Sequence, residues 1–140
     1  MTSQSPAPMS DPLAEDNVSR VAAGPIVFRV AARRGGTDGG PSIRVLGADD
    51  AREYLRFDLF AVAPHYHYFG SSAAGHEAGD RRFMLDTDAE GDAVTWTITK
   101  LRDRLAVMLA AAGGAGLVEQ LDPDVLRGAV DQVEELLVRS

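Results

Sequence analysis

The chain has 140 residues, of which 45% are apolar and 25% charged, the proportions of one globular domain that can bury its own core. Its net charge of −7 and the absence of a Lys/Arg-rich run argue against nucleic acid or an anionic membrane as partner, since both need a basic surface. The chain has no cysteine, which excludes disulfides, thiolate metal ligands and cysteine nucleophiles.

Residues 1–24 are rich in Ser, Pro, Ala and Asp and show little periodicity. This composition predicts a disordered arm, or one that orders only on a partner. A single domain is then expected over residues 25–140. The N-terminus lacks the basic and apolar regions of a signal peptide, and no apolar run approaches the roughly 18 residues that span a bilayer. A cytoplasmic protein without a membrane partner is therefore expected.

Four segments alternate between apolar and polar residues and predict strands, namely residues 26–33, 42–46, 53–60 and 81–86. The glycine-rich residues 35–41 join the first two strands. They predict a hairpin turn and not a phosphate loop, because they lack the Gly-Lys-Ser/Thr ending and do not precede a helix. In the third strand, Arg56 and Asp58 are two residues apart, so their side chains project to the same side and can pair or flank a ligand.

The second half of the chain predicts helices. Residues 94–99 alternate like a strand, but an apolar stripe that continues to Ala112 favours one long helix, which Asp92 would cap and Gly113 would end. Asp122 followed by Pro123 marks the start of a terminal amphipathic helix. The predicted fold is therefore α+β, with a small antiparallel sheet of about four strands followed by, and packed against, two C-terminal helices.

All three histidines lie within twelve residues of one another, at positions 65, 67 and 76. His65 and His67, if extended, would lie on one side of the chain and Tyr66 and Tyr68 on the other. Two imidazoles at this spacing can ligate one divalent metal ion, zinc or iron, and a third ligand from a nearby loop leaves a catalytic position open. His76 can supply that third ligand. The carboxylates of Glu77, Asp80 and Asp58 are alternative ligands, or partners that orient an imidazole.

A His-x-His pair on a strand resembles the metal motif of the cupin barrels. The resemblance is confined to His65 and His67. A cupin carries a glutamate a few residues after the second histidine, whereas the next glutamate here is Glu77. The predicted strands are also too few for a double-stranded barrel, so a cupin fold is not expected.

Two classes of function follow. In the first, the protein is a small metal-dependent hydrolase or lyase whose ion polarises a carbonyl or activates water. Asp58, Tyr66 and Tyr68 would then transfer protons or donate hydrogen bonds, and Arg56 would hold an anionic substrate. In the second, the protein is a non-catalytic accessory subunit of a larger enzyme, with the aromatic segment from Pro64 to Gly70 as its contact surface.

The expected partners are accordingly a small-molecule ligand or a larger protein, with a homodimer as a further option. Two metal-free interpretations of the histidines also remain open. The imidazoles can form a polar ligand or acid–base site, or they can pack against the tyrosines in a purely structural role.

Overall fold

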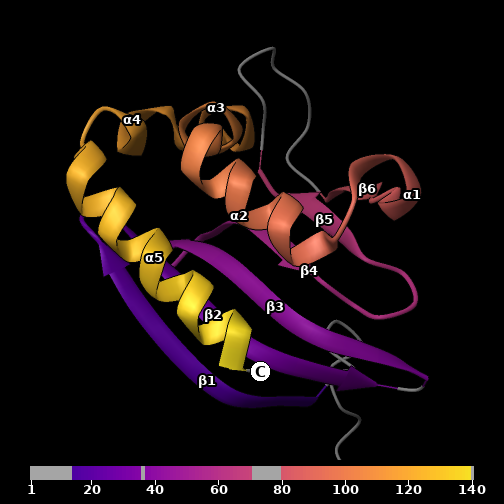
Figure 1. Cartoon of the computed structure of the whole chain (residues 1–140). Helices are drawn as coiled ribbons and strands as arrows, with labels where there is room; N and C mark the ends of the chain where they lie inside the picture. The colour runs from indigo at the N-terminus through magenta and orange to yellow at the C-terminus, as the bar shows by residue number, and fades with distance from the viewer. Residues whose placement is uncertain (1–13, 36, 71–79, 140) are drawn as a thin grey trace, which may run out of the picture.

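The structure, a computed structural model, describes residues 14–35, 37–70 and 80–139. It is an α+β fold in which an antiparallel sheet precedes a set of helices, as predicted (Figure 1). Each strand pairs with the next strand along the chain, so the sheet is a simple meander. The strands are β1 (Ala14–Ala23), β2 (Ile26–Gly35), β3 (Asp38–Gly47), β4 (Glu53–Asp58), β5 (His65–Tyr68) and β6 (Arg81–Met84).

Among the described residues the sheet has six strands, so the expectation of about four was wrong. One additional strand is β5, the aromatic segment that carries His65 and His67. The other is β1, whose ten residues belong to the stretch predicted as a disordered arm. The pairing of β1 with β2 shifts register between Asp16 and Ser19, and Asn17 has a φ of 55°. This bulge interrupts the alternation from which a strand is predicted. Residues 1–13 of the expected arm lie outside the described residues.

The helices are α1 (Thr87–Glu90), α2 (Ala93–Asp103), α3 (Leu105–Leu109), the π-helical η1 (Ala110–Gly114), α4 (Ala115–Val118) and α5 (Pro123–Arg139). Residues 94–99 are helical, as preferred above, and the Asp92 carboxylate caps α2 by accepting from the Thr95 amide. A break at Arg104, with φ −128° and ψ 5°, separates α2 from α3. Within the described part of the chain, no helix has the length and apolar character needed to cross a membrane.

The apolar core lies between one face of the sheet, here called the helix face, and helices α2, α3 and α5. Phe28, Val45 and Leu55 are neighbours across β2, β3 and β4 and are fully buried. Leu101 and Val130 bury against them from the helices. Each such side chain contributes about 1.5–3 kcal/mol to folding relative to an exposed one. The apolar layer therefore determines which face of each strand packs on the helices, and the other face is left for polar side chains.

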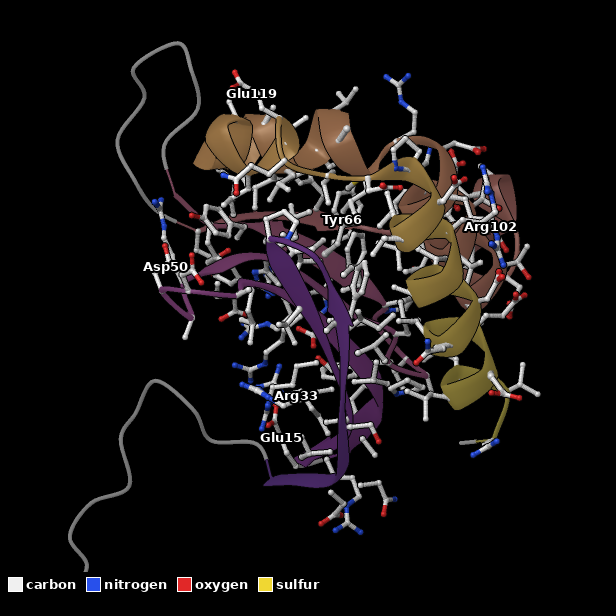
Figure 2. All side chains as sticks on the ribbon, turned by 90° about the vertical axis from the view of Figure 1, so that its left-hand side faces the viewer. Glu15, Arg33, Asp50, Tyr66, Arg102 and Glu119 are labelled. Atoms are coloured by element: carbon white, nitrogen blue, oxygen red, sulfur yellow. The ribbon has the colours of Figure 1, made fainter. Side chains whose placement is uncertain are left out.

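The opposite face of the sheet, here called the charged face, carries Arg29, Arg44 and Arg56 as direct neighbours on β2, β3 and β4. Like charges directly opposite one another destabilise a sheet. Glu15 of β1 offsets this repulsion by accepting from Arg29 at 2.5 Å and from Arg44 at 2.8 Å. Figure 2 shows Glu15 and Arg33 on the side of β1 that faces away from α5. The charged face is therefore held together by ion pairs.

Candidate metal centre

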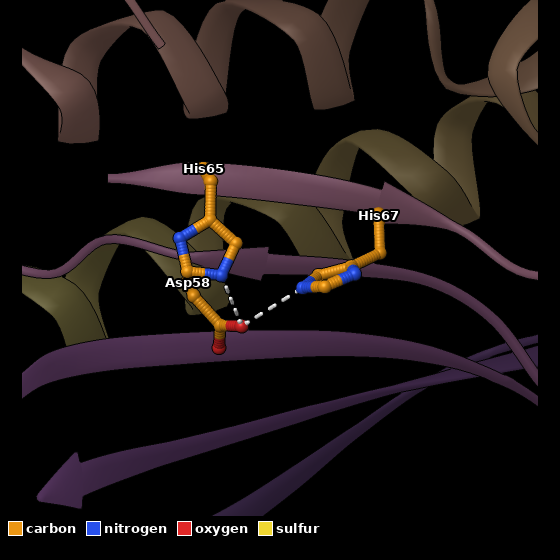
Figure 3. A group of neighbouring side chains, drawn as sticks. All are labelled: Asp58, His65 and His67. Carbon is orange, nitrogen blue, oxygen red and sulfur yellow. Dashed lines mark ion pairs between the residues drawn. The ribbon is translucent and has the colours of Figure 1, made fainter. Parts of the chain in front are cut away.

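The β4–β5 pairing brings two of the three histidines together with a carboxylate. Asp58 lies directly opposite His65, and Arg56 lies directly opposite His67. Because residues two apart on a strand share a face, Asp58, His65 and His67 all project from the charged face. One potential ligand atom from each of these three residues lies within 4.8 Å of the other two, and Figure 3 shows both imidazoles directed at the same Asp58 oxygen.

The loop that precedes His65 is fixed by the β2–β3 turn. The Asp38 carboxylate accepts hydrogen bonds from the amides of Val62 and Ala63, each at 3.0 Å, and the Val62 bond is the main reason why the pKa of Asp38 is lowered. Gly40 lets β3 approach this loop, because a Cβ there would lie 2.5 Å from the Leu59 carbonyl oxygen. The start of β5 is thus set by contacts that are distant in sequence.

The orientation of each imidazole is fixed through its Nδ1 atom. His65 Nδ1 lies 2.8 Å from the carbonyl oxygen of Ala63. A carbonyl can only accept, so this Nδ1 carries the hydrogen. His67 Nδ1 lies 2.6 Å from the Asp80 carboxylate and donates to it in the same way. In both rings the Nε2 atom is consequently the one turned to Asp58, at 3.2 Å for His65 and 3.5 Å for His67.

Asp58 divides its two oxygens between different partners. Its Oδ1 accepts from Ser42 at 2.8 Å and from Arg33 at 3.0 Å, while its Oδ2 faces the two imidazoles. Burial alone would raise the pKa of Asp58, but the hydrogen bonds from His65, His67 and Ser42 and the charge of Arg56 outweigh burial and hold this pKa far below its ordinary value. Asp58 is therefore an anion at any physiological pH.

Two aromatic rings restrict the imidazoles further. Phe60 packs edge-on against His65 with 5.5 Å between ring centroids. Phe69 stacks on His67, with 5.3 Å between the ring centroids and only 6° between the ring planes. The Arg56 guanidinium lies over the Phe69 ring, 5.0 Å from its centroid. The side chains of Asp58, His65 and His67 are only 2%, 11% and 7% exposed, so the group is nearly dry.

The three side chains need positive charge, from protons or from a metal ion, between the imidazoles and Asp58. With both Nδ1 atoms protonated, neutral imidazoles would point two Nε2 lone pairs at a carboxylate oxygen, which is repulsive. Protons on Nε2 relieve the repulsion, and the hydrogen bond to Asp58 raises the pKa of His65 accordingly. A divalent ion relieves it equally well, because two imidazole nitrogens and one carboxylate oxygen form a donor set that suits zinc or iron.

The structure brings together part of the predicted site. Asp58, His65 and His67 converge, and Asp80 is the carboxylate that orients an imidazole. Arg56 is adjacent, with its Nε atom 3.4 Å from Asp58. The predicted ligands His76 and Glu77 lie outside the described residues.

The two tyrosines named as catalytic candidates are placed elsewhere. Tyr66 and Tyr68 pack on the helix face, against the core cluster, so the sheet itself separates them from the imidazoles. Sequence reasoning missed Arg33 and Ser42, which bind Asp58 from β2 and β3. Both residues lie on the polar side of predicted strands, and this position was the only feature of the sequence from which they could have been proposed as site residues.

Fold and site together define a small α+β protein with a buried group of two histidines and one aspartate on the sheet face opposite its helices. The chain belongs to the DUF7700 family, a domain of unknown function, whose model matches residues 20–137. That span contains Asp58, His65, His67 and Asp80. No curated protein and no solved structure shows a significant match to the chain.

Proposed function

We propose that this chain binds one divalent metal ion, zinc or iron, through Asp58 Oδ2 and the Nε2 atoms of His65 and His67. The observation that carries the proposal is the fixing of both Nδ1 atoms by acceptors, Ala63 O and Asp80, which turns both Nε2 atoms to one carboxylate oxygen. Metal-binding histidines characteristically donate their second nitrogen to a carbonyl or a carboxylate in this way.

Three protein ligands leave coordination positions for water or substrate, which is the arrangement of catalytic rather than structural sites. His76 and Glu77 precede Asp80 by only a few residues. We therefore retain both as candidates for a further ligand. A fourth protein ligand would make the site more closed and favour a structural or storage role over catalysis.

The reaction class that suits such a centre is hydrolysis or a lyase reaction, in which the ion polarises a carbonyl or lowers the pKa of bound water. Arg56 is the residue we assign to an anionic substrate, because its guanidinium lies beside Asp58 and it pairs with His67 across β4 and β5. Asp58 acts as a ligand and not as a general acid, since its lowered pKa keeps it deprotonated. Tyr66 and Tyr68 have no part in this mechanism because they lie on the helix face.

An accessory subunit is the second candidate, and one observation favours it. The edge strand β6 exposes Phe83 and Met84, at 41% and 58% of their surfaces, and exposed apolar side chains on an edge suit a protein contact. The segment from Pro64 to Gly70 is less suited to this role, because β5 pairs with β4 on one side and β6 on the other. A contact surface would therefore centre on β6.

Calorimetric titration of metal-free protein with Zn²⁺ tests the first candidate. We expect one ion per chain, and at least a hundredfold weaker binding in His65→Phe and His67→Phe, which keep a flat ring but remove both nitrogens. Tyr66→Phe is the matched control, since it alters the same strand on its other face and should bind as the wild type does. Equal affinity in all four proteins, or no binding by the wild type, would refute the metal site. Co-purification with a larger enzyme would then support the accessory role.

A further inference from the structure

A cavity lies on the helix face of the sheet. This cavity of about 420 Å³, here called the Trp96 cavity, is lined by Tyr66, Tyr68, Trp96, Lys100 and Arg104 together with residues of β6 and α1. Its volume falls in the range of pockets that hold small organic molecules. The sheet separates it from Asp58, His65 and His67, so it does not depend on the metal centre.

Two cationic residues, Lys100 and Arg104, line one wall of the Trp96 cavity. Lys100 and Arg104 lie one helical turn apart, since the Arg104 amide donates to the Lys100 carbonyl, and like charges at this spacing destabilise a helix. Among the described residues neither side chain forms an ion pair with a carboxylate. Arg102, which lies between them in sequence, instead contacts both Asp131 and Glu134 at 2.7 Å. Two cations without an ion-pair partner among the described residues, at one cavity of a chain of net charge −7, favour an anionic group as ligand.

The remaining walls are aromatic. The rings of Tyr66 and Trp96 lie 5.0 Å apart, and the Lys100 ammonium lies 5.5 Å from the centroid of the Trp96 ring. Neither phenol hydroxyl has a hydrogen-bond partner within the described part of the chain. Burial raises the pKa of both Tyr66 and Tyr68, so both phenols remain available as hydrogen-bond donors.

Two acidic residues, Asp86 and Glu90, also line the Trp96 cavity. The Asp86 carboxylate is engaged, because it caps α1 by accepting from the amides of Asp88 and Ala89. Glu90 has no such partner among the described residues, and its charge contributes to raising the pKa of Tyr66. Glu90 thus lies at the Tyr66 end, where it would repel a second acid group.

We infer that the Trp96 cavity binds a small aromatic monocarboxylate, whose ring packs against Trp96 and Tyr66 and whose acid group pairs with Lys100 and Arg104. The tyrosine hydroxyls donate hydrogen bonds to polar groups of the ligand.

Fluorescence titration tests this inference directly, because Trp96 is the only tryptophan of the chain and lines the cavity. The probes are 3-phenylpropionate, the neutral 3-phenylpropionamide and the cationic 2-phenylethylamine. We expect saturable quenching by the acid, with at least about tenfold higher affinity than for the amide, which corresponds to one charge-assisted hydrogen bond. Lys100→Met and Arg104→Met should each weaken the acid about tenfold and leave the amide unchanged.

The control variant is Arg102→Met, which removes the same charge from the same helix but on the side that faces α5. It should bind the acid as the wild type does. Equal affinity for acid and amide, tighter binding of the amine, an equal loss in Arg102→Met, or no saturable quenching by any of the probes would overturn the inference. The comparison of acid, amide and amine on wild-type protein decides the matter even if a variant does not fold.

Discussion

At the scale of single residues, Asp58 is the centre of the charged face. Its side chain is 2% exposed, yet it carries a full charge, which is tolerable only because every side of the carboxylate is paired. Arg33 and Ser42 bind one oxygen, and His65 and His67 approach the other. Since protons and metal ions compete for the same two Nε2 atoms, metal binding and pH must be coupled.

This coupling gives a prediction with a definite sign. Metal binding needs a deprotonated Nε2, and the pKa of His65 is raised above its ordinary 6.5. As the solution is acidified, zinc affinity should therefore start to fall while the pH is still above 6.5. Zinc binding should also release the protons carried by the Nε2 atoms. Titrations in two buffers of different ionisation enthalpy measure the number of protons released.

The metal-free protein should show the opposite trend. A histidine whose pKa is raised on folding contributes stability that is fully present below pH 6.5 and is lost as pH rises through the raised value. Thermal melts in the presence of a chelator should accordingly show stability decreasing above pH 6.5.

Metal affinity that does not change between pH 6 and pH 8 would contradict the assignment of His65 as a ligand.

The sequence allows His65 and His67 to be predicted as a pair, because alternation on a strand depends only on neighbouring residues. Arg33 and Ser42 are different. Which residues of β2 and β3 lie beside Asp58 depends on strand register, which the β2–β3 turn sets through the pairing of Gly35 with Asp38. A shift of the register by one residue would turn these side chains to the other face. The composition of the glycine-rich turn does not predict which of its residues pair, so the register could not be derived from the sequence.

At the scale of elements, the loop between β4 and β5 is a positioning device. Asp38 holds the amides of Val62 and Ala63, and the Ala63 carbonyl in turn accepts from His65 Nδ1. The β2–β3 turn therefore fixes an imidazole that is 27 positions further along the chain.

Replacement of Asp38 by alanine should loosen this arrangement without removing a ligand. We expect zinc affinity to fall by about tenfold or more, as it does when groups that orient a metal-binding histidine are lost. The matched control is Asp86→Ala, which also removes a carboxylate that accepts from two backbone amides but does so at α1. If both variants bind zinc as the wild type does, the loop does not position His65.

Helix boundaries show which elements local sequence determines. Asp92 and Asp122 were predictable caps because capping involves only residues two or three positions away. The break at Arg104 was not predictable, since no glycine or proline marks it and the apolar stripe continues through Leu105. Packing of Leu101 and Leu105 into the core, a tertiary effect, accompanies the break.

At the scale of the whole molecule, β1 completes the sheet. It buries Val21 and Ala23 on the helix face, and its Glu15 contacts three arginines of the charged face, namely Arg29, Arg33 and Arg44. The prediction of an arm failed here because a bulged edge strand with little apolar alternation has the composition of a disordered segment.

Deletion of residues 1–22 should therefore destabilise the protein. The deletion removes the buried Val21 and the partly buried Glu15 carboxylate, which together cost about 3–5 kcal/mol. This corresponds to a fall in Tm of about 10 °C for a domain of this size. Glu15→Gln in the full chain should reproduce part of that fall. Thermal melts of the three proteins provide the comparison, and a deletion that melts within error of the full chain would show that β1 is peripheral.

The central claim is that two imidazoles and one carboxylate of the charged face hold one metal ion. X-ray absorption at the zinc edge of protein loaded with one equivalent of Zn²⁺ tests it most directly. We expect a shell of nitrogen and oxygen ligands at about 2.0–2.2 Å, with the outer-shell scattering of two imidazole rings, and loss of one ring in His67→Phe. A shell without imidazole scattering, or a spectrum unchanged in His67→Phe, would contradict the proposed centre.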